Sequence, residues 1–282
     1  MVPVGNVTLN QKADGYRGIW YMNQPVDSEH QYKYSGGLGT YCDYHAPFAV
    51  YRPEVDRTFF CYGGAPPEDS QRLLHMVSYF DHRTRSVPRP TMLLDKRTSD
   101  AHDNPVISVD AEGYIWIFST AHGTGRPAFI HRSKRPYDVD EFELVPATRR
   151  EGDGVMPLDN FSYLQVYHDP KLGFQATFTR YGYPADRTSC YMTSTDGVRW
   201  SEWKRLAAIE KGHYQIGAVG HGKVGTFMNM HPASKGLNWR TNLYYMESDD
   251  NGETWRVADG TPLEVPLTTA KIAALGARLS GR

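Results

Sequence analysis

Two histidines, a tyrosine and an arginine stand where β-hairpins could bring them together. His102 and His122 flank one run of strand-forming residues, and Tyr163 and Arg180 flank another. An imidazole or a phenol can move a proton, and a guanidinium can hold a carboxylate. Histidine and tyrosine side chains could therefore do acid–base chemistry beside a cation here, provided that the chain folds into hairpins at these places.

The first hairpin is predicted from residues 99–127. Residues 106–109 and 114–120 are apolar, β-branched or aromatic, and the intervening Asp-Ala-Glu-Gly forms a turn. If residue 109 pairs with residue 114, His102 falls opposite Ala121, one position from His122. Residues opposite each other on antiparallel strands are about 5 Å apart at Cβ, so both imidazoles would lie at the open end.

The second hairpin is predicted around a turn at residues 169–173. A register in which paired numbers sum to about 342 places Tyr163 opposite residue 179, next to Arg180. Taken singly, a tyrosine in a strand is more often a core residue and an arginine a surface cation. We therefore consider the four residues together, because the two predicted hairpins place all of them at strand ends.

The amino-acid composition limits the classes of partner that the chain could bind. The chain has 282 residues, with 31 Lys and Arg against 32 Asp and Glu, so overall charge favours neither nucleic acid nor a membrane surface. It has 19 Tyr and 6 Trp, whose faces suit sugar rings. The three cysteines, Cys42, Cys61 and Cys190, have no spacing typical of a disulfide framework or a zinc site. We therefore expect a polysaccharide or oligosaccharide partner, no metal and no cofactor.

A repeated turn predicts the architecture. Ser194-Thr-Asp-Gly-Val-Arg-Trp200 is a shortened form of Ser248-Asp-Asp-Asn-Gly-Glu-Thr-Trp255. A period of about 40–55 residues, with short strands between, is typical of a β-propeller in which each unit is a blade. We expect the two tryptophans at equivalent places in successive blades, a surface loop over 146–160 and a short helix within 268–279.

The second of these turns has the Asp-box pattern of bacterial neuraminidase repeats. Together with GYRGIWY, YKYSGGLGTYC, the two histidine segments and the Tyr163-x-Gln165 strand, it resembles the BNR-4 propellers, which include ulvan lyases and related enzymes acting on rhamnose–glucuronate linkages. The resemblance runs over about residues 14–267. It implies an all-β propeller domain over 1–267, with five to six blades of an incomplete seven-bladed ring, and an atypical tail over 268–282.

The resemblance also implies roles for particular residues. In similar lyases two histidines, a tyrosine and an arginine do the chemistry, which matches His102, His122, Tyr163 and Arg180. These groups would neutralise a uronate carboxylate, remove the proton beside it and protonate the leaving oxygen. The other expected substrate contacts are His45, Arg126 and Gln165.

Three functions remain open from the sequence. The first is a lyase that cleaves a uronate-containing polysaccharide, the second a sialidase-like glycoside hydrolase, and the third a carbohydrate-binding propeller without catalysis. A sialidase would need an arginine triad, and no Arg-Ile-Pro motif accompanies Arg17, Arg52 and Arg126. The family implies a secreted or periplasmic protein, although the first residues do not have the pattern of a signal peptide.

Overall fold

The protein is built almost entirely of β-strands. The computed structural model describes residues 7–15, 44–69, 72–183, 185–235 and 239–275. The chain forms two compact units. That residues 1–267 make up one propeller domain stays a prediction. The first unit contains residues 47–120 and 129–145 with the N-terminal residues, and the second contains residues 44–46, 121–128 and 146–282.

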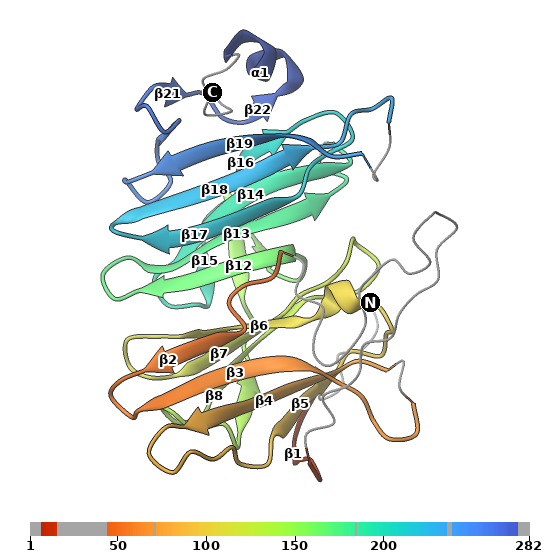
Figure 1. Ribbon diagram of the computed structural model, residues 1–282, viewed down its shortest axis with the longest axis vertical. Coiled ribbons are helices and arrows are strands. Elements are labelled where there is room, and N and C mark those ends of the chain that lie inside the picture. Colours follow the sequence, from red (N-terminus) through yellow and green to blue (C-terminus); the bar gives the residue numbers. More distant parts are fainter. Residues whose placement is uncertain (1–6, 16–43, 70–71, 184, 236–238, 276–282) are drawn as a thin grey trace. The chain divides into compact units, whose positions relative to one another are not determined.

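The first unit has two antiparallel sheets in which consecutive strands are neighbours, except that β1 pairs with β5 (Figure 1). One sheet has the order β1-β5-β4-β3-β2, and the other has the order β6-β7-β8-β9. The strands are β1 (Thr8–Lys12), β2 (Ala49–Arg52), β3 (Arg57–Gly64), β4 (Leu74–Asp81), β5 (Thr91–Asp95), β6 (Pro105–Val109), β7 (Ile115–Ser119), β8 (Phe129–Ser133) and β9 (Phe142–Leu144).

The predicted β6–β7 hairpin forms, but its register differs by one residue. Val109 pairs with Ile115 rather than with Tyr114. Asp110 causes the shift, because its carboxylate accepts the backbone N–H groups of Glu112 and Tyr114 and the indole N–H of Trp116. Tyr114 is thereby drawn into the turn, so the loop is one residue longer than expected.

The second unit has two five-stranded sheets and one three-stranded sheet. Their orders are β12-β13-β14-β16-β22, β17-β18-β19-β20-β21 and β11-β10-β15. The strands are β10 (Thr148–Glu151), β11 (Gly154–Pro157), β12 (Ser162–Asp169), β13 (Gly173–Tyr181), β14 (Arg187–Ser194), β15 (Arg199–Trp200), β16 (Lys204–Ala208), β17 (Gln215–Gly220), β18 (Lys223–Met230), β19 (Thr241–Ser248), β20 (Trp255–Arg256), β21 (Pro262–Leu263) and β22 (Leu267–Thr268).

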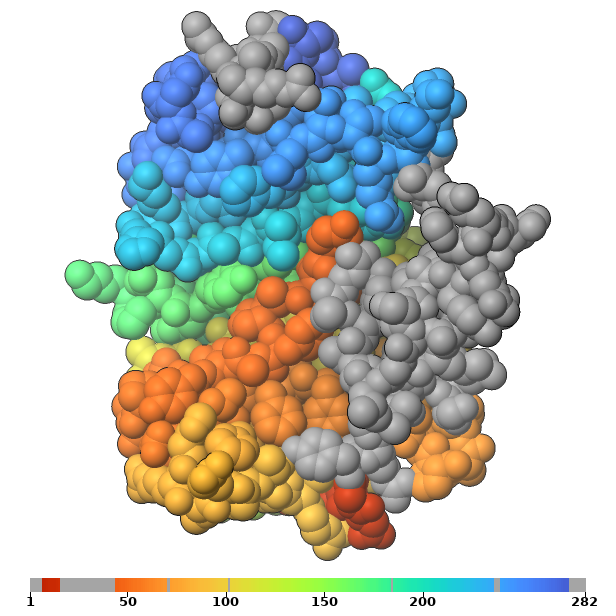
Figure 2. Space-filling view, in the orientation of Figure 1, coloured from red at the N-terminus to blue at the C-terminus, as the bar shows by residue number. Residues whose placement is uncertain are grey.

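An apolar core joins the two large sheets of the second unit. It is built from Tyr191, Leu206, Met228, Met246, Trp255 and other buried residues. Burial of such side chains contributes about 1.5–3 kcal/mol each. Figure 2 shows the part of the chain that holds β17–β19 at the surface, in cyan to blue. On the sheet face opposite this core, large apolar side chains stay exposed, including Ile216, Phe227 and Leu243.

The two repeated turns have the same internal hydrogen bonds. The Trp200 indole donates to the carbonyl of Gly197 at 2.9 Å, and the Trp255 indole donates to the carbonyl of Gly252 at 3.1 Å. In each turn the serine hydroxyl accepts the glycine N–H and the aspartate carboxylate accepts backbone N–H groups further on. The tryptophans therefore occupy equivalent places in the two turns. Sheets of consecutive antiparallel strands with this repeat form a β-propeller fold.

Two local expectations differ from the structure. Residues 146–160 contain the β10–β11 hairpin rather than only a loop, and all four residues of β11 are exposed, so no apolar alternation revealed them. The expected helix over 268–279 is the short α1 (Thr269–Leu275), while Thr268 ends β22. The segments GYRGIWY and YKYSGGLGTYC, with Cys42, fall almost wholly outside the described residues. Cys61 and Cys190 are buried free thiols, and no described helix is long and apolar enough to cross a membrane.

Candidate functional site

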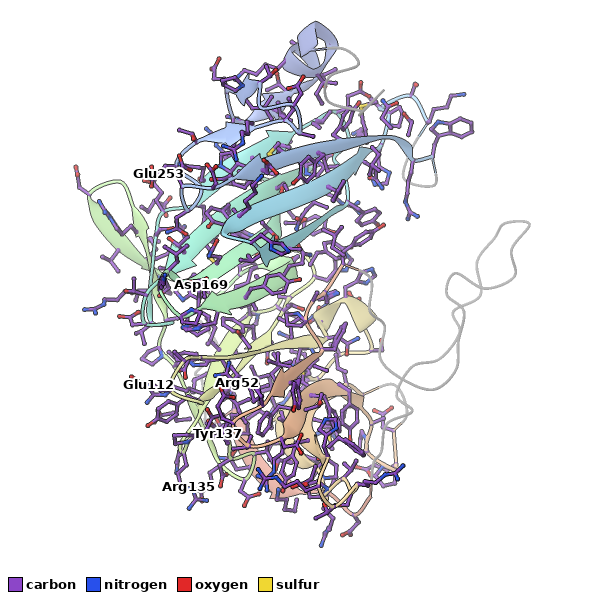
Figure 3. All side chains as sticks on the ribbon, turned by 60° about the vertical axis from the view of Figure 1, so that its left-hand side comes forward. Arg52, Glu112, Arg135, Tyr137, Asp169 and Glu253 are labelled. Carbon is purple, nitrogen blue, oxygen red and sulfur yellow. The ribbon has the colours of Figure 1, made fainter. Side chains whose placement is uncertain are left out.

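A cluster of aromatic and basic side chains lies at one end of the two large sheets of the second unit. Strands β12, β14 and β17 begin at this end, and β13 and β18 finish there. The opposite end holds the turns with Asp169 and Glu253, which Figure 3 labels together on the left. The meander topology thus gathers residues that are far apart in sequence at the first end.

Tyr163 is at the centre of this cluster and has an unusual backbone. The predicted register of the β12–β13 hairpin holds from Asp169, which pairs with Gly173, to Gln165, which pairs with Thr177. A bulge then shifts the pairing, so Ser162 rather than Tyr163 pairs with Thr179. Tyr163 has φ +49°, a conformation that costs a bulky residue about 1–3 kcal/mol and that clusters at functional sites.

Five rings surround Tyr163 within the second unit. The ring centroids of His45, Tyr214, Tyr44, His122 and Tyr181 lie 5.6, 5.5, 6.0, 6.1 and 6.3 Å from that of Tyr163. Tyr44 also stacks on Tyr214 at 4.7 Å. Most of these contacts are edge-to-face, which aromatic quadrupoles favour, so the cluster has a fixed geometry.

A line of hydrogen bonds runs from Tyr163 through Tyr181 to His122. The phenol oxygens of Tyr163 and Tyr181 are 3.1 Å apart, and the Tyr181 oxygen is 3.1 Å from His122 Nε2. Tyr163 is only 1% exposed, whereas His122 and Tyr181 are partly exposed. The line can therefore pass a proton between a buried phenol and a group nearer to solvent.

The segment that carries His122 is fixed by residues just before β12. Ala121 N–H donates to the carbonyl of Phe161, and the carbonyl of Ala121 accepts the hydroxyl of Ser162. The Asn160 amide donates to the carbonyl of Gly123 at 2.8 Å. These contacts hold the His122 imidazole against Tyr181, although His122 does not itself lie in a strand.

Arg187 supplies the guanidinium of the cluster. Its Cζ lies 4.4 Å from the ring centroid of Tyr214 and 5.4 Å from that of Tyr181, and Nη1 is 3.4 Å from His231 Nε2. Gly212, at φ +98°, makes room for it, because a Cβ there would lie 2.6 Å from Arg187 Cβ. The cluster thus has a cation beside its phenols.

Burial keeps the two phenols of the line protonated. Burial, followed by the charges of Tyr181 and Tyr214, raises the pKa of Tyr163 above its ordinary 10.0. Burial likewise raises the pKa of Tyr181, although Arg187 opposes the shift. At neutral pH both groups hold their protons, so they are suited to act as acids rather than as bases.

Arg180 lies elsewhere, contrary to the prediction that it adjoins Tyr163. Side chains alternate along a strand, so the Tyr181 ring faces Tyr163 while Arg180 points to the other side of β13. Its Nη1 donates to Asn160 Oδ1 at 2.7 Å, and its Cζ lies 5.5 Å from the Trp203 ring centroid. The structure therefore brings Arg187, and not Arg180, to Tyr163.

Gln165 is a structural residue rather than a substrate contact. It is 0% exposed. Its amide N–H groups donate to the carbonyls of Tyr44 and Tyr163, and its oxygen accepts from Thr177 and Gly217. Every hydrogen-bonding position of the side chain is thus occupied by the protein.

The other predicted residues are placed as follows. His45 is buried against Tyr163, and Arg126 is partly exposed in the segment that carries His122. His102 belongs to the first unit, where it is 8% exposed and its Nδ1 lies 2.7 Å from Asp100 Oδ1. Its convergence with His122 stays a prediction.

Sequence reasoning missed Tyr181, Arg187 and Tyr214. Tyr181 could have been found, because it follows Arg180 and strand alternation puts only one of the two beside Tyr163. Arg187 pairs directly with Tyr181 across β13 and β14, which the sequence alone does not specify. Tyr214 comes from the next sheet, so only the tertiary fold reveals it.

Comparisons with known proteins agree with this architecture. Two solved ulvan lyase structures of polysaccharide lyase family 25 match with TM-scores of 0.66 and 0.67, each at 17% sequence identity. The matches cover 84% and 91% of this chain but only 59% and 60% of those structures, so the chain spans about 60% of their length. No curated protein matches the sequence significantly. The sequence model of the BNR repeat-containing family matches residues 69–277, and the chain therefore belongs to that family.

Proposed function

We propose that this protein is a polysaccharide lyase that cleaves a uronate-containing, ulvan-like polysaccharide by β-elimination. The observation that carries the proposal is the hydrogen-bonded line His122–Tyr181–Tyr163 beside Arg187. The likeness in fold to ulvan lyases supports it, since one of those structures holds an oligosaccharide of glucuronate and sulfated rhamnose. The resemblance noted in the sequence assigns acid–base work to a histidine and tyrosine set that overlaps this line.

In the proposed reaction, Arg187 faces the uronate carboxylate and lowers the cost of negative charge beside it. His122 takes the proton on the carbon next to the carboxylate, and the electron pair of that carbon–hydrogen bond forms a carbon–carbon double bond as the glycosidic bond breaks. Tyr181 gives its proton to the leaving oxygen, and the Tyr163 hydroxyl, which accepts from Tyr181 before the reaction, then donates a hydrogen bond to the phenolate. His122 then returns its proton to Tyr181, so no net proton is gained or lost.

The burial of Tyr163 explains why Tyr181 enters this scheme. The resemblance assigns the hydroxyl to Tyr163, but that residue is 1% exposed, whereas Tyr181 is partly exposed and contacts both Tyr163 and His122. We propose His102 as a second histidine of the site, and His45 and Arg126 as substrate contacts. Arg187 takes the role that the sequence had given to Arg180.

The test compares conservative variants in a lyase assay that follows the near-ultraviolet absorbance of the unsaturated uronate product. Tyr181→Phe, Tyr163→Phe and His122→Gln should each lower kcat about 10²–10⁴-fold, because each breaks the proton line. Tyr51→Phe, which removes the same hydroxyl from an exposed tyrosine of β2 outside the Tyr163 cluster, is the matched control and should stay within a few-fold of wild type. If Tyr181→Phe keeps wild-type turnover while Tyr163→Phe abolishes it, the hydroxyl role belongs to Tyr163 alone and the relay is wrong.

A further inference from the structure

A second group of basic side chains surrounds Trp203, on the face of β13 away from Tyr163. Arg149 of β10 lies with its Cζ 3.8 Å from the Trp203 ring centroid, and Arg180 of β13 lies at 5.5 Å. Arg205 of β16 approaches Tyr183, whose ring packs edge-on to Trp203 at 5.8 Å between centroids. Two strands thus bring two guanidinium groups to one indole, and a third strand places Arg205 beside the tyrosine that packs on that indole.

The charges here are only partly compensated. Arg149 Nη2 is 2.6 Å from Glu151 Oε2, and Arg180 Nη1 donates to the neutral amide of Asn160. Burial, together with the charge of Arg149, lowers the pKa of Arg180. Burial raises the pKa of the nearby Cys190 thiol to about 12, although the charges of Arg180, Arg205 and Arg149 oppose this rise.

Three buried donors in this group have no acceptor among the described residues. They are Nε of Arg149, Nε of Arg180 and the indole Nε1 of Trp203. A buried donor left without an acceptor costs about 1–3 kcal/mol, and more when the group is charged. Three such donors around one indole, two of them on cations, are what an oxyanion site presents before its ligand binds.

We propose that Arg149, Arg180 and Trp203 form an oxyanion-binding site, separate from the Tyr163 cluster. Its ligand is a sulfate, phosphate or carboxylate group, which is either a free ion or a substituent of an acidic glycan. The guanidinium Nε edges bind the oxygens, and the indole N–H adds a third donor. Arg205 and Tyr183, which are exposed and partly exposed, border the site on its solvent side.

The first test measures the melting temperature of the full chain in sodium sulfate against sodium chloride of equal ionic strength. Sulfate at about ten times its Kd should raise Tm by about 2–4 °C. Arg149→Gln should weaken sulfate binding about ten- to a hundred-fold. Arg150→Gln removes the same charge from an exposed neighbour on β10 and should bind sulfate as wild type does.

A second measurement follows sulfate binding in the wild-type protein and uses a variant only to assign one resonance. In wild-type protein, a sulfate titration should move the indole N–H resonance of Trp203, assigned by its loss in Trp203→Phe, more than the other tryptophan resonances. Comparing free sulfate with a sulfated oligosaccharide and its desulfated form distinguishes the two sources. The proposal is overturned if sulfate acts no differently from chloride, if the Trp203 resonance does not move, or if Arg150→Gln weakens binding as much as Arg149→Gln.

Discussion

His213 should make the protein lose stability on mild acidification, and the size of the loss follows from its surroundings. The side chain is 0% exposed, and neither ring nitrogen has a hydrogen-bond partner among the described residues. Burial, then the charges of Arg187 and His231, lower the pKa of His213 from 6.5 to about 3. The imidazole is thus neutral in the folded protein at any pH above about 3.

The sign and magnitude follow from proton linkage. Below pH 6.5 the unfolded chain binds a proton at His213 that the folded chain does not, so acid favours unfolding. Between about pH 7 and pH 5 this costs about 2 kcal/mol, at about 1.4 kcal/mol per pH unit once the unfolded histidine titrates. Above pH 7 both states are neutral there, and the group contributes no pH dependence.

The assay is urea unfolding of wild type and His213→Leu at the two pH values. Leucine has a similar volume and cannot titrate, so any packing cost appears at both pH values and cancels in the difference. Wild type should lose about 2 kcal/mol more than the variant on acidification. His221→Asn, in the exposed β17–β18 turn, is the control and should behave as wild type. Equal losses in wild type and His213→Leu would refute the reasoning.

Two further predictions concern the Tyr163 cluster. Gly212→Ala should lower the free energy of unfolding by about 2–4 kcal/mol, since it adds both backbone strain and a clash with Arg187, whereas Gly260→Ala, at φ +87° in open space, should cost only about 1 kcal/mol. Similar losses in both would show that Arg187 is not held by Gly212. At alkaline pH, wild type should lose stability above pH 10, because tyrosines ionise in the unfolded chain before Tyr163 does in the folded one. Chemical unfolding as a function of pH should therefore show that the free energy of unfolding declines less steeply in Tyr163→Phe than in wild type. An unchanged slope would contradict the raised pKa of Tyr163 in the folded protein.

The sequence predicted the elements better than it predicted the contacts between them. The paired tryptophan turns and the register near Gln165 follow from local rules, since turn residues and strand alternation act over a few positions. The bulge at Tyr163 and the one-residue shift after Val109 do not, because each arises from hydrogen bonds that pattern alone does not specify.

In the candidate site, too, local rules predicted some residues, and contacts between strands and sheets brought in the others. His122 and Tyr163 were predicted and lie in the same cluster. The predicted placement of Arg180 beside Tyr163 was wrong by one strand position, because strand alternation turns the Arg180 side chain away from Tyr163. Arg187 reaches the cluster through pairing of β13 with β14, and Tyr214 reaches it only because one sheet packs against the next. Contacts of this kind depend on the assembled unit rather than on any segment.

The most direct test of the central claim is the product formed from a uronate-containing polysaccharide such as ulvan. Wild-type protein should generate a new reducing end and an unsaturated uronate in equal amounts, followed by near-ultraviolet absorbance and by mass spectrometry. Tyr181→Phe, assayed beside it, should produce both far more slowly. Reducing ends without the unsaturated sugar would show a hydrolase, and binding of the polysaccharide without either product would show a propeller that binds carbohydrate without cleaving it; either result would contradict the proposed lyase.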